Sequence, residues 1–299
     1  MIFISTGGIR HRSAATSARS FYDHGITAVE LSGGVFSPTY ETDLKSLAGD
    51  MVLQVHNYFP PPEKPFVFNL ASADSEVSQR SVSHVRSAMR LALALNHPVY
   101  SFHAGFRISP KVSDLGQTLG KYSLLDRNKA LVQFGEQVIQ LAEEAKREGV
   151  LLLIENNVLT KTNLETYSED PLLLTHPDEI AEFMEEMPSN VGFLLDVAHL
   201  KVSSTTLGFD LVKAHEKIKP WIRGYHLSDN DGNVDSNHPV TESSWFWPVL
   251  NPQLDYYTLE IYRSSIQQLV EQLSLVTQEI NKLYASLDEG YSNEQDNAN

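Results

Sequence analysis

The stretch VLLLIE, residues 150–155, places a glutamate directly after five apolar residues. The stretch GFLLD, residues 192–196, ends in the same way with an aspartate. A continuously apolar run of this length suits a strand that other elements cover on both faces, which is the usual situation in a parallel sheet. These two stretches therefore predict strands of a parallel α/β protein.

Six further runs of β type lie before and after these two stretches. The complete set of expected strands is Ile2–Ser5, Thr27–Leu31, Val52–His56, Val99–His103, Val150–Glu155, Gly192–Asp196, Ile222–His226 and Tyr257–Ile261. Helical patterns separate most of them, at residues 13–24, 75–95, 122–148, 178–187, 210–217 and 263–285. Eight strands that alternate with helices predict a single (β/α)8 TIM barrel. An open, doubly wound sheet is the alternative, although no glycine-rich stretch has the spacing of a nucleotide-binding loop.

The bulk composition limits the possible classes of function. The 299 residues include 38 acidic and 23 basic ones, which gives a formal net charge of −15. A field of this sign repels polyanions, so we expect no nucleic-acid partner unless a local basic cleft overrides it. The chain has no cysteine, which excludes disulfides, thiolate metal ligands and cysteine nucleophiles.

The two ends of the chain also carry predictions. The apolar start is too short for a signal peptide, and no later apolar run is long enough to span a bilayer. We therefore expect a cytoplasmic protein with no membrane partner. From about Ser286 the chain is polar and acidic. The expected organisation is one barrel over residues 1–285, followed by a disordered tail over residues 286–299.

Six consecutive predicted strands end in a side chain that can bind a metal or move a proton. These residues are His56, His103, Glu155, Asp196, His226 and Glu260. In a barrel all these ends lie at one rim, where the active sites of this fold are built. A lone histidine at a strand end is more often a hydrogen-bonded structural residue, and a lone carboxylate can cap the next helix. Six of them in register favour a functional site instead.

Glu155, Asp196, His226 and Glu260 form an oxygen-rich ligand set with one imidazole. Such a set suits Mn²⁺, Mg²⁺ or Co²⁺, and Zn²⁺ is also acceptable. We therefore expect one divalent metal ion. The ion can act as a Lewis acid on a carbonyl or a pair of hydroxyls, while a carboxylate beside it takes a proton from the adjacent carbon.

The motifs IENN (154–157), LLDVAH (194–199), GYHLSDNDG (224–232) and TLEIY (258–262) resemble the xylose-isomerase-like barrels. These include sugar-phosphate isomerases, ketose 3-epimerases and endonuclease IV-type repair enzymes, and the resemblance covers nearly the whole chain. In the epimerase branch, the residues that match Glu155, Asp196, His226 and Glu260 hold one metal, and the two glutamates are the acid/base pair. His199 matches a substrate-contacting histidine. The resemblance implies a metal-dependent isomerase or epimerase of a sugar or sugar phosphate, often a homodimer.

The repair-enzyme branch is the alternative. In that branch, residues that match His56, His103 and His199 help to bind three zinc ions, together with an Asp-x-His pair. This chain has DSNH at residues 235–238, so Asp235 is present but Asn237 occupies the histidine position. In an extended segment the next residue, His238, would point the wrong way. We therefore favour small-molecule sugar chemistry over an endonuclease of abasic DNA.

The remaining site predictions concern contacts with the substrate. We expect them from His56, His103, His199 and Asp235 at the rim. Arg10 follows the first strand at the same rim, where it can receive a phosphate or carboxylate of the substrate or lie in a solvated turn. Glu30, near the end of the second strand, is either another polar rim residue or a buried residue paired with an arginine.

Overall fold

The computed structural model describes residues 1–9, 12–114 and 120–296, and within them eight strands form a closed barrel. Each strand is parallel to both of its neighbours. The strands are β1 (Ile2–Ser5), β2 (Ala28–Leu31), β3 (Val52–His56), β4 (Val99–His103), β5 (Leu151–Glu155), β6 (Val191–Asp196), β7 (Ile222–Leu227) and β8 (Tyr257–Leu259). The predicted TIM barrel is therefore confirmed, and the open sheet is excluded.

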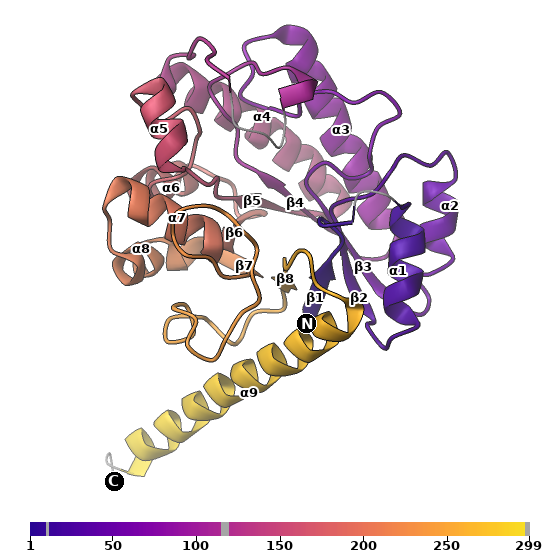
Figure 1. Cartoon of the computed structure of the whole chain (residues 1–299), viewed down its shortest axis with the longest axis vertical. Coiled ribbons are helices and arrows are strands. Elements are labelled where there is room, and N and C mark those ends of the chain that lie inside the picture. Colours follow the sequence, from indigo (N-terminus) through magenta and orange to yellow (C-terminus); the bar gives the residue numbers. More distant parts are fainter. Residues whose placement is uncertain (10–11, 115–119, 297–299) are drawn as a thin grey trace.

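Helices surround this ring of strands, as Figure 1 shows. They are α1 (Ala14–Tyr22), α2 (Tyr40–Lys45), α3 (Ser75–Ala94), α4 (Arg127–Glu148), α5 (Lys161–Tyr167), α6 (Pro177–Glu185), α7 (Val197–Leu207), α8 (Leu211–Ile218) and α9 (Ile266–Asp296), with 3-10 turns η1 (Val112–Asp114) and η2 (Lys219–Trp221). None of the helices in the described part of the chain is long and apolar enough to cross a membrane.

Capping residues set several of the helix ends. The predicted helix that begins at Tyr122 begins instead at Arg127, because the Asp126 side chain accepts a hydrogen bond from the backbone N–H of Lys129 and caps α4 there. Gly149 ends the same helix with a φ of 73°, a left-handed conformation that glycine adopts without strain.

Helices α2, α5 and α7 were not predicted from the sequence. The first two are short, and α7 has the sequence VAHLKVSSTTL, rich in β-branched residues and serines that have low helix propensity. It forms because Asp196, the last residue of β6, caps it directly: its Oδ1 accepts from the N–H of His199 at 2.7 Å. Asp196 thus ends β6 and caps α7 through Oδ1, while its Oδ2 has no hydrogen-bond partner.

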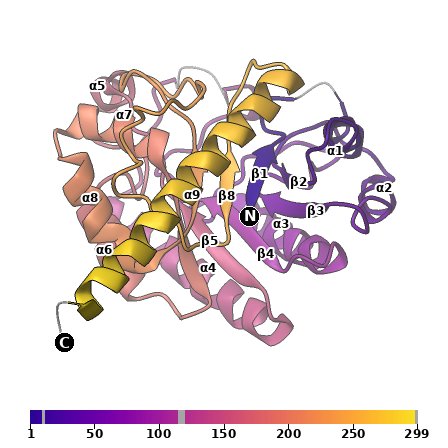
Figure 2. The ribbon, with the colours of Figure 1, turned by 90° about the horizontal axis from the view of Figure 1, so that it is seen from below.

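The chain ends in the long helix α9. Figure 1 shows its C-terminal part projecting beyond the barrel, and Figure 2 shows the helix running across the barrel. Its first half packs on the core through Leu269, Val276 and Ile280. Its helical backbone continues past Ser286 to Asp296, where the sequence favours a disordered tail. The boundary at residue 285 therefore stays a prediction.

Candidate metal centre and substrate cavity

The four predicted ligands meet at the carboxyl end of the barrel. Glu155 ends β5, Asp196 ends β6, His226 lies one residue before the end of β7, and Glu260 directly follows β8. One potential ligand atom from each residue lies within 4.8 Å of those of the others. All four residues are buried, so the barrel register brings together side chains that are far apart in sequence.

His226 Nδ1 lies among the three carboxylates. It is 3.2 Å from Oε2 of Glu260, 3.4 Å from Oε1 of Glu155 and 3.9 Å from Oδ2 of Asp196. Both carboxylate oxygens of Glu155, Oδ2 of Asp196 and Nδ1 of His226 are buried without a hydrogen-bond partner. Buried carboxylates without partners are costly unless a cation compensates them. This donor set therefore fits a divalent ion that prefers oxygen ligands.

The three carboxyl groups of the cluster differ in the direction in which their pKa values are shifted. Burial by itself raises the pKa of Glu155, but the charges of His103 and His226 outweigh it, and the net pKa lies well below the usual range. For Glu260, the close approach and the positive charge of His226 outweigh burial and lower the pKa to about 2. Burial and the charge of Glu155 raise the pKa of Asp196 to about 7. Both glutamates are thus ready to act as ionised ligands.

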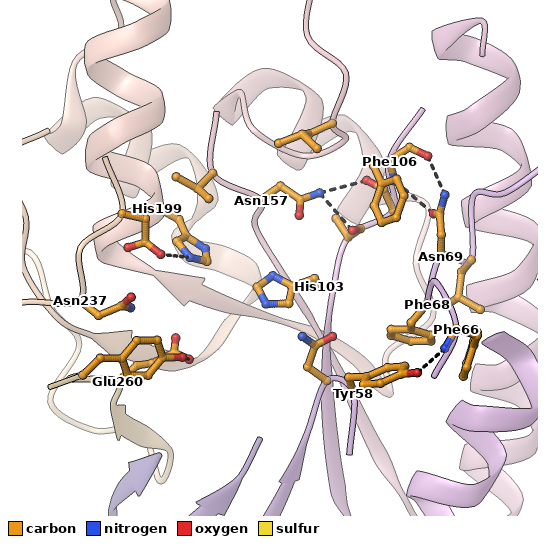
Figure 3. A pocket seen from close by; sticks show the side chains of 18 residues that line it. Tyr58, Phe66, Phe68, Asn69, His103, Phe106, Asn157, His199, Asn237 and Glu260 are labelled. Carbon is orange, nitrogen blue, oxygen red and sulfur yellow. Dashed lines mark hydrogen bonds and ion pairs between the residues drawn. The ribbon is translucent and has the colours of Figure 1, made fainter. Parts of the chain in front are cut away.

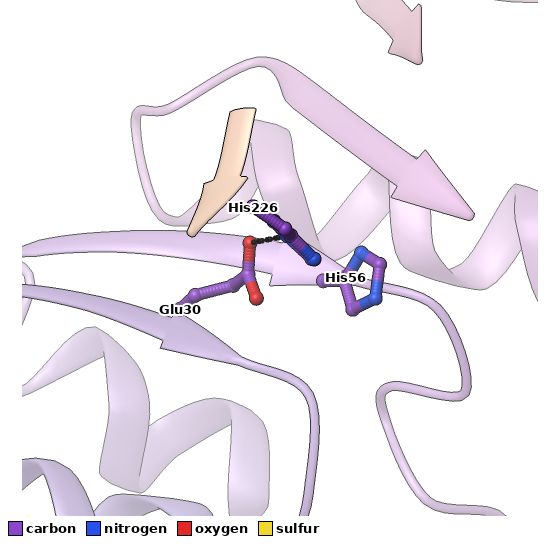
Figure 4. Close-up of side chains that lie close together, drawn as sticks. All are labelled: Glu30, His56 and His226. Carbon is purple, nitrogen blue, oxygen red and sulfur yellow. Dashed lines mark hydrogen bonds and ion pairs between the residues drawn. The ribbon is translucent and has the colours of Figure 1, made fainter. Parts of the chain in front are cut away.

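A second carboxylate orients the imidazole of His226. Oε2 of Glu30 lies 3.0 Å from His226 Nε2 (Figure 4). The same oxygen accepts from the hydroxyls of Tyr256 and Thr258. A carboxylate can only accept from the imidazole, so Nε2 carries a proton, and Nδ1 is the nitrogen that can offer its lone pair to a cation in the ligand cluster. Glu30 is buried, but it pairs with a histidine rather than the arginine considered from the sequence.

His56 and His103 also point at Glu155. Their Nε2 atoms lie 3.3 Å and 3.8 Å from its Oε2, and these three residues form a second group that could hold a metal ion. His56 is further fixed by a 2.9 Å hydrogen bond between its Nδ1 and the hydroxyl of Ser101. His56 is buried, whereas 31% of the His103 side chain is exposed and faces a cavity.

His199 and Asp235 form a pair beside the cluster. The Nε2 of His199 lies 3.3 Å from Oδ2 of Asp235, and its Nδ1 donates to the carbonyl of Asn156 at 2.9 Å. Asn237 is buried and lines the same cavity. His238 is exposed, and its backbone pairs with Asp229. The structure therefore agrees with the sequence, which has no histidine to complete an Asp-x-His pair with Asp235.

A cavity of about 580 Å³ borders the cluster at Glu260 (Figure 3). His103, His199, Asp235 and Glu260 line it, together with Tyr58 and other residues of the rim loops. A second cavity of about 650 Å³ shares Asn57, Tyr58, His103, Glu260 and Tyr262 with the first and also contacts His56. Volumes of this order suit small molecules. Within the described part of the chain, no lysine or arginine lines either cavity.

Two further cavity residues were not singled out from the sequence. The side-chain NH2 of Asn157 donates to the carbonyls of Ala104, Gly105 and Leu173, so its oxygen is turned to the other side, that of His103 in Figure 3. Tyr262 donates to Glu260. Both residues lie in the motifs IENN and TLEIY, but their side-chain directions follow from tertiary contacts. Arg10, the remaining predicted contact, lies outside the described residues.

Known proteins share this fold. A model of the family described as the xylose isomerase-like TIM barrel matches residues 19–255. No curated protein matches the chain. Among solved structures, a D-tagatose 3-epimerase-like protein is similar over 96% of this chain and 99% of its own, with a TM-score of 0.72 and 18% identity.

Two other solved structures have the same fold. The D-psicose 3-epimerase from Clostridium cellulolyticum H10, in a structure with D-tagatose, has a TM-score of 0.62 and 13% identity over 97% of this chain and 98% of its own. The TTHB071 protein from Thermus thermophilus, soaked with ZnCl2, has a TM-score of 0.59 and 19% identity over 93% and 98%. At these identities the likeness establishes the fold.

Proposed function

Because this chain belongs to the xylose isomerase-like TIM barrel family, we propose that it is a metal-dependent sugar isomerase or epimerase. The observation that carries the proposal is the position of the unpartnered oxygens of Glu155 and Asp196 and of Nδ1 of His226. They converge directly beside a cavity that Glu260 lines. A metal site and a space for a small substrate therefore share one glutamate.

Glu155 and Glu260 are the proposed acid/base pair. One carboxylate removes the proton next to the substrate carbonyl, the electrons of the broken C–H bond enter an enediolate, and a proton returns to carbon from a glutamate. Return to the other face gives an epimer. Return to the former carbonyl carbon, with transfer of the hydroxyl proton to the enediolate oxygen, gives an isomer. The chemistry that a divalent ion supplies here is polarisation of the carbonyl and stabilisation of negative charge. The lowered pKa values of both glutamates favour the carboxylate form, which is the form that accepts a proton.

The surrounding polar side chains suit the hydroxyls of a sugar. The oxygen of Asn157 can accept from one hydroxyl, while His103, His199 and Asp235 offer further contacts in the same cavity. The absence of lysine and arginine from the described lining favours an unphosphorylated sugar, because phosphate sites usually carry such charges. We propose one ion of Mn²⁺, Mg²⁺, Co²⁺ or Zn²⁺ in the four-ligand group, with His56 and His103 beside the substrate.

The endonuclease alternative has less support. The net charge of −15 opposes binding of a polyanion, and among the described residues the cavity linings carry no basic side chain of lysine or arginine. The Asp-x-His pair of that branch also lacks its histidine here, since Asn237 occupies the position and His238 is exposed. A cytoplasmic location and a homodimer stay predictions.

The experiment uses the purified chain stripped with EDTA and reloaded with Mn²⁺. It is incubated with D-fructose, D-psicose, D-tagatose or L-ribulose, and with fructose 6-phosphate as the phosphorylated counterpart, and the products are resolved by chromatography and NMR. We expect conversion of at least one free ketose that needs the metal and is lost in Glu260→Gln. If none of the free sugars is converted while the phosphorylated sugar is, the preference for an unphosphorylated substrate is wrong.

A further inference from the structure

Tyr262 gives the two oxygens of Glu260 different partners. Its hydroxyl donates a 2.5 Å hydrogen bond to Oε1, whereas Oε2 faces Nδ1 of His226 at 3.2 Å and thus the ligand cluster. Tyr262 is half-buried and lines both cavities, as Glu260 does. The hydrogen bond therefore lies at the boundary between the ligand cluster and the space for the substrate.

The backbone holds the tyrosine ring in this place. A Cβ added to Gly8 would lie 2.9 Å from the ring atom Cδ1, and a Cβ added to Gly7 would overlap the hydroxyl oxygen. Only glycine at these two positions lets the loop after β1 pack so closely on the ring. From the opposite chain segment, the carbonyl of Asn237 accepts from the N–H of Tyr262 at 3.1 Å. These backbone contacts hold the Tyr262 ring so that its hydroxyl points at Glu260.

We infer that Tyr262 is a positioning residue that keeps Oε1 of Glu260 on the substrate side and leaves only Oε2 for the metal site. This inference rests on the proposed function. A carboxylate that is free to rotate can bind a divalent ion through both oxygens, and it then has no oxygen left to exchange a proton with the substrate. The Tyr262 hydrogen bond occupies one lone pair of Oε1 and leaves the other available.

Tyr262→Phe removes the hydroxyl and preserves the ring. The first readout is Mn²⁺ affinity, measured by titration of the metal-free full-length protein. We expect tighter binding, by about 3- to 10-fold, because Glu260 gains freedom to bind the ion with its second oxygen. An affinity that is unchanged or weaker overturns the inference, whatever happens to activity. Circular dichroism and the melting temperature show that the variant is folded.

The second readout is proton exchange of Mn²⁺-loaded protein in D₂O, starting separately from D-fructose and from D-psicose, which differ only at C3. Wild type should incorporate deuterium at C3 from both. Tyr262→Phe should exchange at a near wild-type rate from the epimer whose proton Glu155 removes. From the other epimer its exchange rate should fall by about 10- to 100-fold, the effect of losing a hydrogen bond to a charged group. For that epimer kcat should be reduced and KM should change little. Equal loss from both epimers, or no loss, contradicts the inference.

Tyr257→Phe is the matched control. The Tyr257 hydroxyl donates to the carbonyl of Asn251 at 2.6 Å, in the same strand region but outside both cavities. Losing this hydroxyl should leave Mn²⁺ affinity and exchange from both epimers as in wild type. If wild type itself exchanges neither sugar, the epimerase proposal fails for these substrates, whereas the affinity readout still decides the role of Tyr262.

Discussion

The Nε2 atom of His226 lies 3.0 Å from Oε2 of Glu30, although the two residues are 196 positions apart in sequence. This contact crosses the barrel interior from β7 to β2 and fixes which imidazole nitrogen faces the ligand cluster. Glu30→Gln should therefore weaken Mn²⁺ binding by about 10- to 100-fold, the usual effect of removing such an outer-shell carboxylate. Glu41→Gln, which changes an exposed carboxylate on α2, should bind Mn²⁺ as wild type does. Equal affinities of Glu30→Gln and wild type would show that Glu30 does not orient the ligand.

Chelation should abolish turnover without unfolding the barrel. The four predicted ligands lie at or next to strand ends and are not part of the hydrophobic core, so we expect the metal-free protein to stay folded. It should melt at a lower temperature than the metal-bound protein, because the unpartnered carboxylates then repel each other. Adding Mn²⁺, Co²⁺, Mg²⁺ or Zn²⁺ should raise the melting temperature in a concentration-dependent way and restore activity. Full activity in protein shown to be free of metal by mass spectrometry would contradict this prediction.

His215 should make the protein sensitive to mild acid. It is fully buried beside the hydroxyl of Tyr225, and burial lowers its pKa from 6.5 to about 4. The unfolded chain therefore binds a proton at a pH where the folded protein does not. The contribution of His215 to the free energy of unfolding should therefore fall as the pH decreases from about 6.5 to 4, by up to ~1.4 kcal/mol per pH unit. Urea unfolding at several pH values measures this slope.

His215→Gln removes the titrating ring, so its stability should depend less steeply on pH over this interval. His24→Gln changes an exposed histidine on the surface and should retain the wild-type slope. An identical pH dependence in His215→Gln and wild type would show that other groups account for acid sensitivity.

The protein should not nick duplex DNA that contains an abasic site. The net charge of −15 and Asn237 in place of a histidine are the reasons. The test is incubation of a labelled duplex with protein loaded with Zn²⁺ or Mn²⁺ at moderate salt, with Glu155→Gln prepared in parallel to reveal contaminating nuclease. Efficient nicking by wild type alone would reverse the order of the two enzyme hypotheses.

The barrel was predictable because its strands are continuously apolar and end in polar side chains. Runs such as VLLLIE indicate both the strand and the position of Glu155, and parallel closure then places the strand ends at one rim. The four-ligand cluster followed from the same reasoning. Helix α7 did not, since its residues have low helix propensity and its start depends on the cap by Asp196.

Contacts across the barrel were less accessible from the sequence. The partner of Glu30 depends on the direction of two side chains on β2 and β7, which no local pattern encodes. The roles of Asn157 and Tyr262 likewise depend on carbonyls and glycines from distant loops. The sequence predicted that His56 and His103 lie at the rim, but only the structure shows that their Nε2 atoms face Oε2 of Glu155.

The most direct test of the two-glutamate mechanism is deuterium exchange by Glu155→Gln and Glu260→Gln in D₂O. Wild type with Mn²⁺ should incorporate deuterium at the carbon next to the carbonyl of its ketose substrate. Each glutamine variant should stay folded. The rate of the proton transfer that the replaced glutamate performs, and the rate of overall turnover, should fall by at least about 10²- to 10⁴-fold, because a general base contributes that much. Asp196→Asn should act mainly through metal affinity and recover partly in excess Mn²⁺. Near wild-type exchange and turnover in either glutamine variant would contradict the mechanism and reduce that glutamate to a structural ligand.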